Sequence, residues 1–177
     1  LERNKGFHVL AQALSSLRGP WTWVLVGDGP YRPAIARAVA DAAIAPRTVF
    51  TGRVQEADLH AWYEAATLFV HPTLYEGSSL VTLEAMAHRR PVVATVAGGL
   101  PDKVKAGETG WLVEPGRPDA LAAAVAEAVT ATDRLPAMGQ AGRRLAESVF
   151  SWVVAARMQL DIYAELTGVK AGARSPR

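Results

Sequence analysis

The sequence predicts an α/β domain, in which a Rossmann-like parallel sheet carries helices on both faces. Half of the 177 residues are apolar, which is enough for a full core. Short apolar runs alternate along the chain with stretches whose apolar residues recur at helical spacing. Strands separated by helices of this length are joined by right-handed crossovers, and such strands form a parallel sheet covered on both faces.

The first part of the chain contains three predicted helices and three predicted strands. Phe7, Leu10 and Leu14 share one face of the first helix, and Gly19-Pro20 ends it. The elements after it are recognised by the same helical spacing or by short apolar runs. In order they are the strand 21–26, a helix around 35–42, the strand 49–51, a helix around 59–66 and the strand 68–70.

The second part is predicted to contain two strands and four helices, most of them bounded by glycine or proline. Pro118 stands where a first helical residue is favoured. In order the elements are the helix 79–87, the strands 92–95 and 111–113, the Ala-rich helix 118–129, and helices at about 133–149 and 151–166. The large aromatic side chains are predicted to lie in the core, in particular Trp62, Trp111 and Trp152.

Composition and charge exclude several classes of function. The formal net charge is only +2 and the basic residues are scattered, so no nucleic-acid partner is predicted. The chain contains no cysteine, which excludes a disulfide framework and a thiolate metal site. Because no apolar run approaches the roughly 20 residues of a membrane span, we expect a cytoplasmic protein. The basic end, 170–177, is expected to be a frayed terminus.

A ligand site is predicted at one rim of the sheet. Ligands of such folds bind beyond the carboxyl ends of the strands, which places the segments 27–29, 52–54, 71–79 and 97–99 along this rim. The helix that begins near Ser79 offers unpaired backbone N–H groups, and Gly77 lets a ligand approach them. Glu76 precedes the helix, and Glu84 lies roughly 9 Å along it from Ser78. A diphosphate bound there would have one carboxylate near each of its two substituents.

These residues also resemble a known signature. Glu76 and Glu84, with Ala85-Met86-Ala87 and the segment 91–95, are similar to the motif of retaining glycosyltransferases of GT-B fold, the family 4 or group 1 type. The likeness extends over nearly the whole chain. Its further segments are Lys5-Gly6, 26–30, Gly98-Gly99 and 109–113.

The resemblance implies a nucleotide-sugar-binding domain over residues 1–177, with C-terminal helices at about 133–166. This would be the C-terminal half of a two-domain enzyme that transfers a sugar from a UDP or GDP type of donor with retention. No cofactor and no metal are expected, and the sequence contains no Asp-x-Asp pair. The acceptor-binding N-terminal domain is expected to lie outside this chain. The fragment alone should therefore be inactive, and any membrane contact should come through the missing half.

The resemblance also assigns roles to individual residues. Glu84 would hold the ribose hydroxyls and Glu76 a hydroxyl of the donor sugar, while Lys5 would neutralise the diphosphate. Glu76 and Lys5 are thus the predicted catalytic residues. The backbone would complete the site, with Arg53-Val54 bordering the base, Gly77 in the turn, and Ser78, Ser79 and Leu80 donating N–H groups to the diphosphate.

The sequence departs from the family pattern at three places. The arginine usually found five residues before the lysine would fall ahead of Leu1, together with the first strand of the domain. Ser78 stands where an aromatic residue is common, and Asp102 where glutamate is usual. The first departure is expected to weaken the binding of diphosphate, and the other two to alter the choice of sugar.

Other interpretations are open for the chain and for its residues. Glu84 could bond a neighbouring loop amide, Lys5 could be an ordinary exposed lysine, and Gly27-Asp28-Gly29 could be only a tight turn. A dinucleotide-dependent oxidoreductase is disfavoured, because Arg32 stands where its fingerprint needs a third small residue. The alternative from another class is a non-catalytic nucleotide-binding or interaction domain of the same fold.

Overall fold

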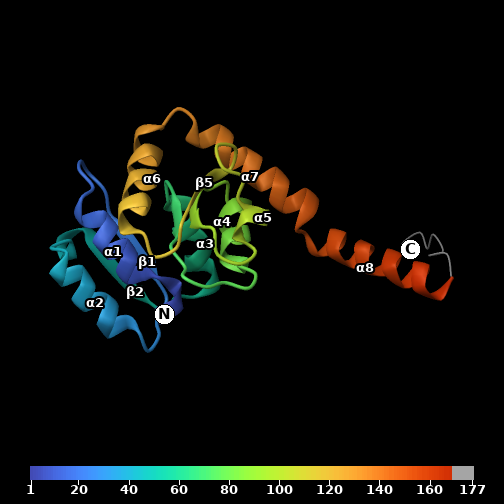
Figure 1. Ribbon diagram of the computed structural model, residues 1–177, viewed down its shortest axis with the longest axis horizontal. Coiled ribbons are helices and arrows are strands. Elements are labelled where there is room, and N and C mark those ends of the chain that lie inside the picture. Colours follow the sequence, from blue (N-terminus) through green and yellow to red (C-terminus); the bar gives the residue numbers. More distant parts are fainter. Residues whose placement is uncertain (169–177) are drawn as a thin grey trace.

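The structure, a computed structural model, describes residues 1–168, so the basic end at 170–177 lies outside the described residues. The strands are β1 (Trp23–Val26), β2 (Thr48–Gly52), β3 (Phe69–His71), β4 (Val92–Thr95) and β5 (Gly110–Val113). The longer helices are α1 (Phe7–Ser15), α2 (Arg32–Asp41), α3 (Glu56–Ala65), α4 (Leu80–Ala87), α6 (Pro118–Thr130), α7 (Leu135–Val149) and α8 (Trp152–Thr167). Short helical turns are η1 (Arg3–Lys5), η2 (Ala45–Arg47) and α5 (Leu100–Lys103). All the predicted helices and strands are present, and only the short turns were not predicted (Figure 1).

Every strand pair is parallel, as predicted, but the strands form two sheets instead of one. β1 pairs with β2, while β3, β4 and β5 form a separate three-stranded sheet. The expectation of one continuous sheet is therefore corrected, although the parallel α/β class is confirmed.

Helices cover both faces of the larger sheet. Val93 of β4 belongs to a buried cluster with Leu10, Ile35 and Leu121, which come from α1, α2 and α6. Its neighbour Val92 belongs to a second cluster, which the helices α4, α5 and α7 supply. Successive side chains of a strand point to opposite faces, so this division shows β4 buried from both sides.

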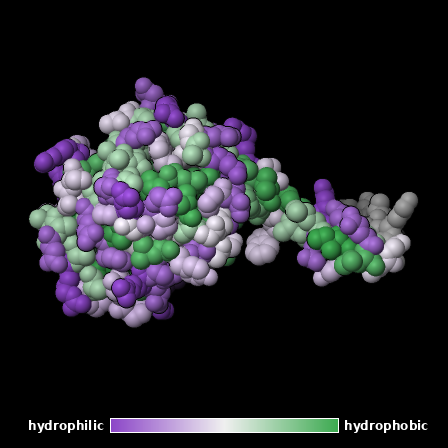
Figure 2. Space-filling view, in the orientation of Figure 1, coloured by the Kyte–Doolittle hydropathy of each residue, from purple (hydrophilic) through white to green (hydrophobic). Residues whose placement is uncertain are grey.

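Helix α8 contributes no side chain to either cluster. It extends away from the rest of the domain in Figure 1, and no residue of the helix is buried. Apolar side chains are visible along this protruding segment in Figure 2. Among the residues 1–168, no helix combines the length and the apolar character that a membrane crossing requires.

The prediction that the tryptophans lie in the core is right for one of the three. Trp111 of β5 is 7% exposed and packs in the first cluster, whereas Trp152 is 84% exposed and Trp62 is 37% exposed. Trp152 opens α8 and therefore has no core beside it. On α3 the buried aromatic residue is Tyr63 instead of Trp62.

Candidate functional site

The loops after β1 and β2 lie side by side at the carboxyl ends of their strands. The N–H of Gly27 donates to the carbonyl oxygen of Gly52 over 2.8 Å. Asp28 accepts a hydrogen bond from the N–H of Gly29 and pairs with Arg32 in the first turn of α2. Asp28 therefore closes a tight turn that leads into a helix, in agreement with the structural interpretation of this segment.

Helix α4 begins at an open turn. Ser79 is the N-cap, and its buried hydroxyl accepts hydrogen bonds from the N–H and the hydroxyl of Thr82. The N–H groups of Ser78, Ser79 and Leu80 have no acceptor among residues 1–168. A Cβ placed on Gly77 would meet nothing within 4 Å, so the outer side of this turn is free. The start of α4 thus has the free N–H groups and the positive dipole end that an anion requires.

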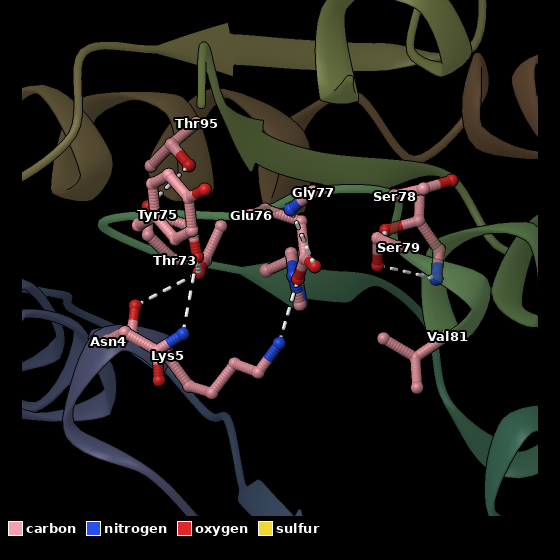
Figure 3. Close-up of polar contacts among 12 residues, drawn as sticks. Asn4, Lys5, Thr73, Tyr75, Glu76, Gly77, Ser78, Ser79, Val81 and Thr95 are labelled. Atoms are coloured by element: carbon pink, nitrogen blue, oxygen red, sulfur yellow. Dashed lines mark hydrogen bonds and ion pairs between the residues drawn. The ribbon is translucent and has the colours of Figure 1, made fainter. Parts of the chain in front are cut away.

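Lys5 and Glu76 meet beside this turn. The ammonium of Lys5 lies 2.8 Å from Oε2 of Glu76, and Nε2 of His71 lies 3.0 Å from the same oxygen. The other oxygen, Oε1, accepts a hydrogen bond from the N–H of Gly77. Figure 3 shows Lys5 reaching across to Glu76, with Ser78 and Ser79 beyond Gly77. The structure therefore brings together the two predicted catalytic residues and adds a histidine.

The backbone fixes Lys5 in this place. The carbonyl oxygen of Asn4 accepts a hydrogen bond of 2.9 Å from the hydroxyl of Thr73 (Figure 3). The same oxygen accepts one of 2.7 Å from the N–H of Leu74. Gly6 has a φ of +69°, and a Cβ there would lie only 1.9 Å from the carbonyl oxygen of Pro72. Only glycine fits this approach, so the segment before α1 is held against the loop after β3.

Electrostatics keep the Glu76 carboxyl ionised. Burial acts to raise its pKa, but the hydrogen bonds from Lys5 and His71 outweigh burial, and the pKa lies below its ordinary value. Burial lowers the pKa of His71, against the opposing effect of its hydrogen bond to Glu76. The neutral imidazole then carries its proton on Nε2, because a carboxylate can only accept. Glu76 is thus a fixed anion with two donors on one oxygen.

Glu84 lies farther along α4 and has a different partner. Its Oε2 accepts a hydrogen bond of 2.9 Å from the hydroxyl of Tyr63, which belongs to α3. The ring of Tyr63 stacks on His88 with 5.3 Å between centroids. Burial, and then the charge of Glu84, raise the pKa of Tyr63, so the phenol stays protonated and donates. The partner of Glu84 is therefore a buried phenol rather than a loop amide.

The predicted base-binding residues are not bonded to the two acids within residues 1–168. Arg53 is exposed, and no hydrogen bond or ion pair joins it or Val54 to Glu76 or Glu84 among the described residues. Val54 borders a hollow of about 620 Å³ between β2 and α3, whose other lining residues are Val49, Thr51, Asp58, Ala61, Trp62 and Ala65.

The loop after β4 braces the turn from the inner side. A Cβ on Gly98 would lie 1.6 Å from the carbonyl oxygen of Glu76, and the N–H of Gly99 donates to the carbonyl oxygen of Gly77 over 3.2 Å. Lys103, at the end of α5, donates to Oγ of Ser78 over 3.0 Å. The sequence interpretation missed Lys103, and it did not predict the contact of Tyr63 with Glu84 or that of His71 with Glu76. A lysine four residues after the Gly-Gly pair was the available signal.

Metal ligands do not gather at this rim or elsewhere in residues 1–168. No group of three or more His, Cys, Asp or Glu side chains there could hold a metal ion.

The chain is similar to known proteins over most of its length. Residues 1–131 match the family described as "Glycosyl transferases group 1". The chain is 35% identical over 158 residues to the GDP-mannose-dependent alpha-(1-6)-phosphatidylinositol monomannoside mannosyltransferase of Mycobacterium tuberculosis. That match covers 84% of this chain and 41% of the relative, so the chain spans less than half of the relative's length.

Solved structures show the same fold. Sucrose-phosphate synthase from Thermosynechococcus elongatus superposes with a TM-score of 0.85 at 31% identity, covering 96% of this chain and 44% of that one. HepE of Anabaena, crystallised with UDP, superposes with a TM-score of 0.86 at 26% identity, covering 93% of this chain and 46% of that one.

Proposed function

Because the chain belongs to the group 1 glycosyl transferases, we propose that it binds a nucleoside diphosphate sugar at the start of α4. One observation carries the proposal: the backbone N–H groups at this helix start have no acceptor among residues 1–168, and they lie between the Lys5–Glu76 pair and Glu84. Two similar proteins support it, because one is named as dependent on GDP-mannose and the other was solved with UDP.

The diphosphate is bound by backbone and by Lys5. The N–H groups of Ser78, Ser79 and Leu80 donate to its oxygens, and the dipole of α4 favours its negative charge. The ammonium of Lys5 has three donors and uses one on Glu76, so the others remain for a phosphate oxygen. These donors stabilise the charge that develops on the leaving diphosphate, and they do so without a metal ion.

The two carboxylates bind hydroxyl groups on either side of the diphosphate. Glu84 accepts from the ribose, since Tyr63 occupies only Oε2 and holds the carboxylate in one orientation. Glu76 accepts from a hydroxyl of the donor sugar, and its lowered pKa keeps it an acceptor at neutral pH. The base, of the UDP or GDP type, lies near Arg53 and Val54.

The whole enzyme transfers the sugar with retention at the anomeric carbon. The chain spans less than half of each of the three similar proteins described above, and we assign the acceptor to a second domain. Turnover accordingly requires that domain, whereas binding of the nucleotide does not.

Calorimetric titration of this chain with UDP, GDP and ADP tests the proposal. We expect selective binding of one nucleotide, and a roughly tenfold loss of affinity in Glu84→Gln, which keeps the shape of the side chain but not its charge. Glu108→Gln, an exposed residue in the loop before β5, is the matched control and should bind like the parent. The proposal is wrong if none of the three nucleotides binds. If Glu84→Gln bound the nucleotide as tightly as the parent, Glu84 would not be part of the binding site.

A further inference from the structure

Lys103 is a buried cation that has no countercharge within the part of the chain that the structure describes. The residue is 5% exposed, and its ammonium donates to Oγ of Ser78 over 3.0 Å. The same ammonium lies 5.6 Å from the centroid of the Phe150 ring. No carboxylate among residues 1–168 lies within ion-pair distance of it. A hydroxyl and an aromatic face are weak compensation for removing a charge from water.

The position of Lys103 relates this charge to the start of α4. Gly98 and Gly99 hold the inner side of the turn 76–78 through close backbone contacts, and α5 follows them directly. The outer side of the same turn is open at Gly77, and Ser78 is itself exposed. Ser78 therefore links a buried ammonium on one side to the free surface on the other.

The chemistry of this contact fixes the direction of the serine hydroxyl. An ammonium can only donate, so Oγ of Ser78 must be the acceptor. The hydroxyl proton is then not used in this bond and remains available to a second acceptor. A charge in a region of low dielectric also acts more strongly on a nearby anion than a charge in water does.

We propose that Lys103 is a positioning residue for the donor's diphosphate, acting through Ser78. The ammonium holds Oγ as acceptor, so that the Ser78 hydroxyl donates to a phosphate oxygen at the open turn. Its buried charge adds to the attraction that the backbone N–H groups exert on the diphosphate. This inference rests on the proposed function, because it needs the diphosphate to bind at the start of α4.

Lys103→Met tests the inference, since methionine is similar in length but carries no charge. We expect about fivefold weaker binding of UDP or GDP, whichever the parent binds, and unchanged binding of the matching nucleoside. We also expect a melting temperature that is equal or higher, because replacing a buried charge by an apolar side chain removes its desolvation penalty. Lys105→Met, an exposed lysine two residues further on, should behave like the parent.

Ser78→Ala provides the second arm. If the ammonium acts through this hydroxyl, Ser78→Ala weakens the binding of the nucleotide to a similar degree. The double variant Ser78→Ala/Lys103→Met then loses little further affinity. Additive losses would overturn the path through Ser78.

Three other results would also overturn the inference. If Lys103→Met binds the nucleoside diphosphate as tightly as the parent, the inference is wrong while the proposed function stands. If the variant has a lower melting temperature and loses affinity for nucleoside and nucleotide to the same extent, Lys103 has only a structural role. If the parent binds no nucleoside diphosphate, both the proposed function and this inference fall.

Discussion

Removing the hydroxyl of Tyr63 tests whether this group orients Glu84 for binding a ribose. Tyr63→Phe removes one oxygen atom and leaves the ring that stacks on His88, so the packing of α3 on α4 should persist. The substitution deletes the 2.9 Å hydrogen bond to Oε2 of Glu84 and a longer one, 3.4 Å, to the carbonyl oxygen of Val81. The carboxylate then loses the contact that fixes its orientation.

The expected magnitude follows from the burial of the two partners. A hydrogen bond to a charged group contributes about 1.5–3 kcal/mol. Tyr63 is buried, but Glu84 is only half-buried, so water can replace part of what the phenol supplies. We therefore expect a loss of about 1 kcal/mol in nucleotide binding, which is roughly a fivefold weaker affinity.

The assay compares a ribonucleotide with an analogue that lacks the ribose hydroxyls. The parent and Tyr63→Phe are titrated with UDP or GDP and with the matching 2′,3′-dideoxynucleoside diphosphate. If Glu84 holds the ribose, the parent loses affinity for the dideoxy analogue, and Tyr63→Phe has little effect on that analogue. Tyr163→Phe, in the exposed helix α8, is the matched control and should bind both ligands like the parent.

Two outcomes would refute this reasoning. Equal affinity of Tyr63→Phe and the parent for the ribonucleotide would mean that the phenol does not prepare Glu84. If Tyr63→Phe lost affinity equally for the ribonucleotide and for the dideoxy analogue, Tyr63 would act on the position of α4 as a whole.

The remaining predictions concern the turn itself. Because the pKa of Glu76 lies below its ordinary value of 4.5, its pair with Lys5 stabilises the fold fully above that value and is lost as the pH falls through the lower folded pKa. Thermal unfolding followed from neutral to acidic pH should therefore show a shallower acid decline in Lys5→Met; an unchanged curve would contradict the pairing. Gly98→Ala should abolish nucleotide binding, because its Cβ would lie 1.6 Å from the carbonyl oxygen of Glu76. Gly107 also has a positive φ, but a Cβ there would meet open space. Gly107→Ala therefore measures only the cost of a left-handed backbone conformation to the stability of the fold, about 1–2 kcal/mol. Equal binding by the two alanine variants, measured by calorimetry, would show that the close approach of Gly98 is not needed.

The helices and strands were predictable because their signals are local. Leu10 and Leu14 are buried on α1 as the helical spacing indicates, and the predicted strand 92–95 is fully buried in β4. Periodicity failed where an element is too short to show a period, as in the four-residue helix α5. It also could not predict that the sheet is divided, because strand pairing joins residues far apart in the chain.

The site was predictable in its motif but not in its partners. Glu76 and Glu84 were identified as candidate site residues from their spacing around a helix start. Tyr63 is 21 residues from Glu84, in the predicted helix around 59–66, and periodicity could not predict its contact because a buried phenol and a buried phenyl ring give the same pattern. Lys103 is 25 residues from Ser78 and lies on the helix that was not predicted.

The two acids are not equivalent, although the motif presents them as a pair. Glu76 has donors on both oxygens, since Lys5 and His71 share Oε2 and the N–H of Gly77 occupies Oε1. Glu84 has Oε1 without a hydrogen-bond donor among residues 1–168. A ligand hydroxyl can therefore reach Glu84 at an oxygen that no protein donor uses, whereas at Glu76 it must share Oε1 with the N–H of Gly77. The affinity lost in Glu84→Gln consequently reports a ligand contact, while any substitution of Glu76 also disturbs the turn that carries the diphosphate-binding N–H groups.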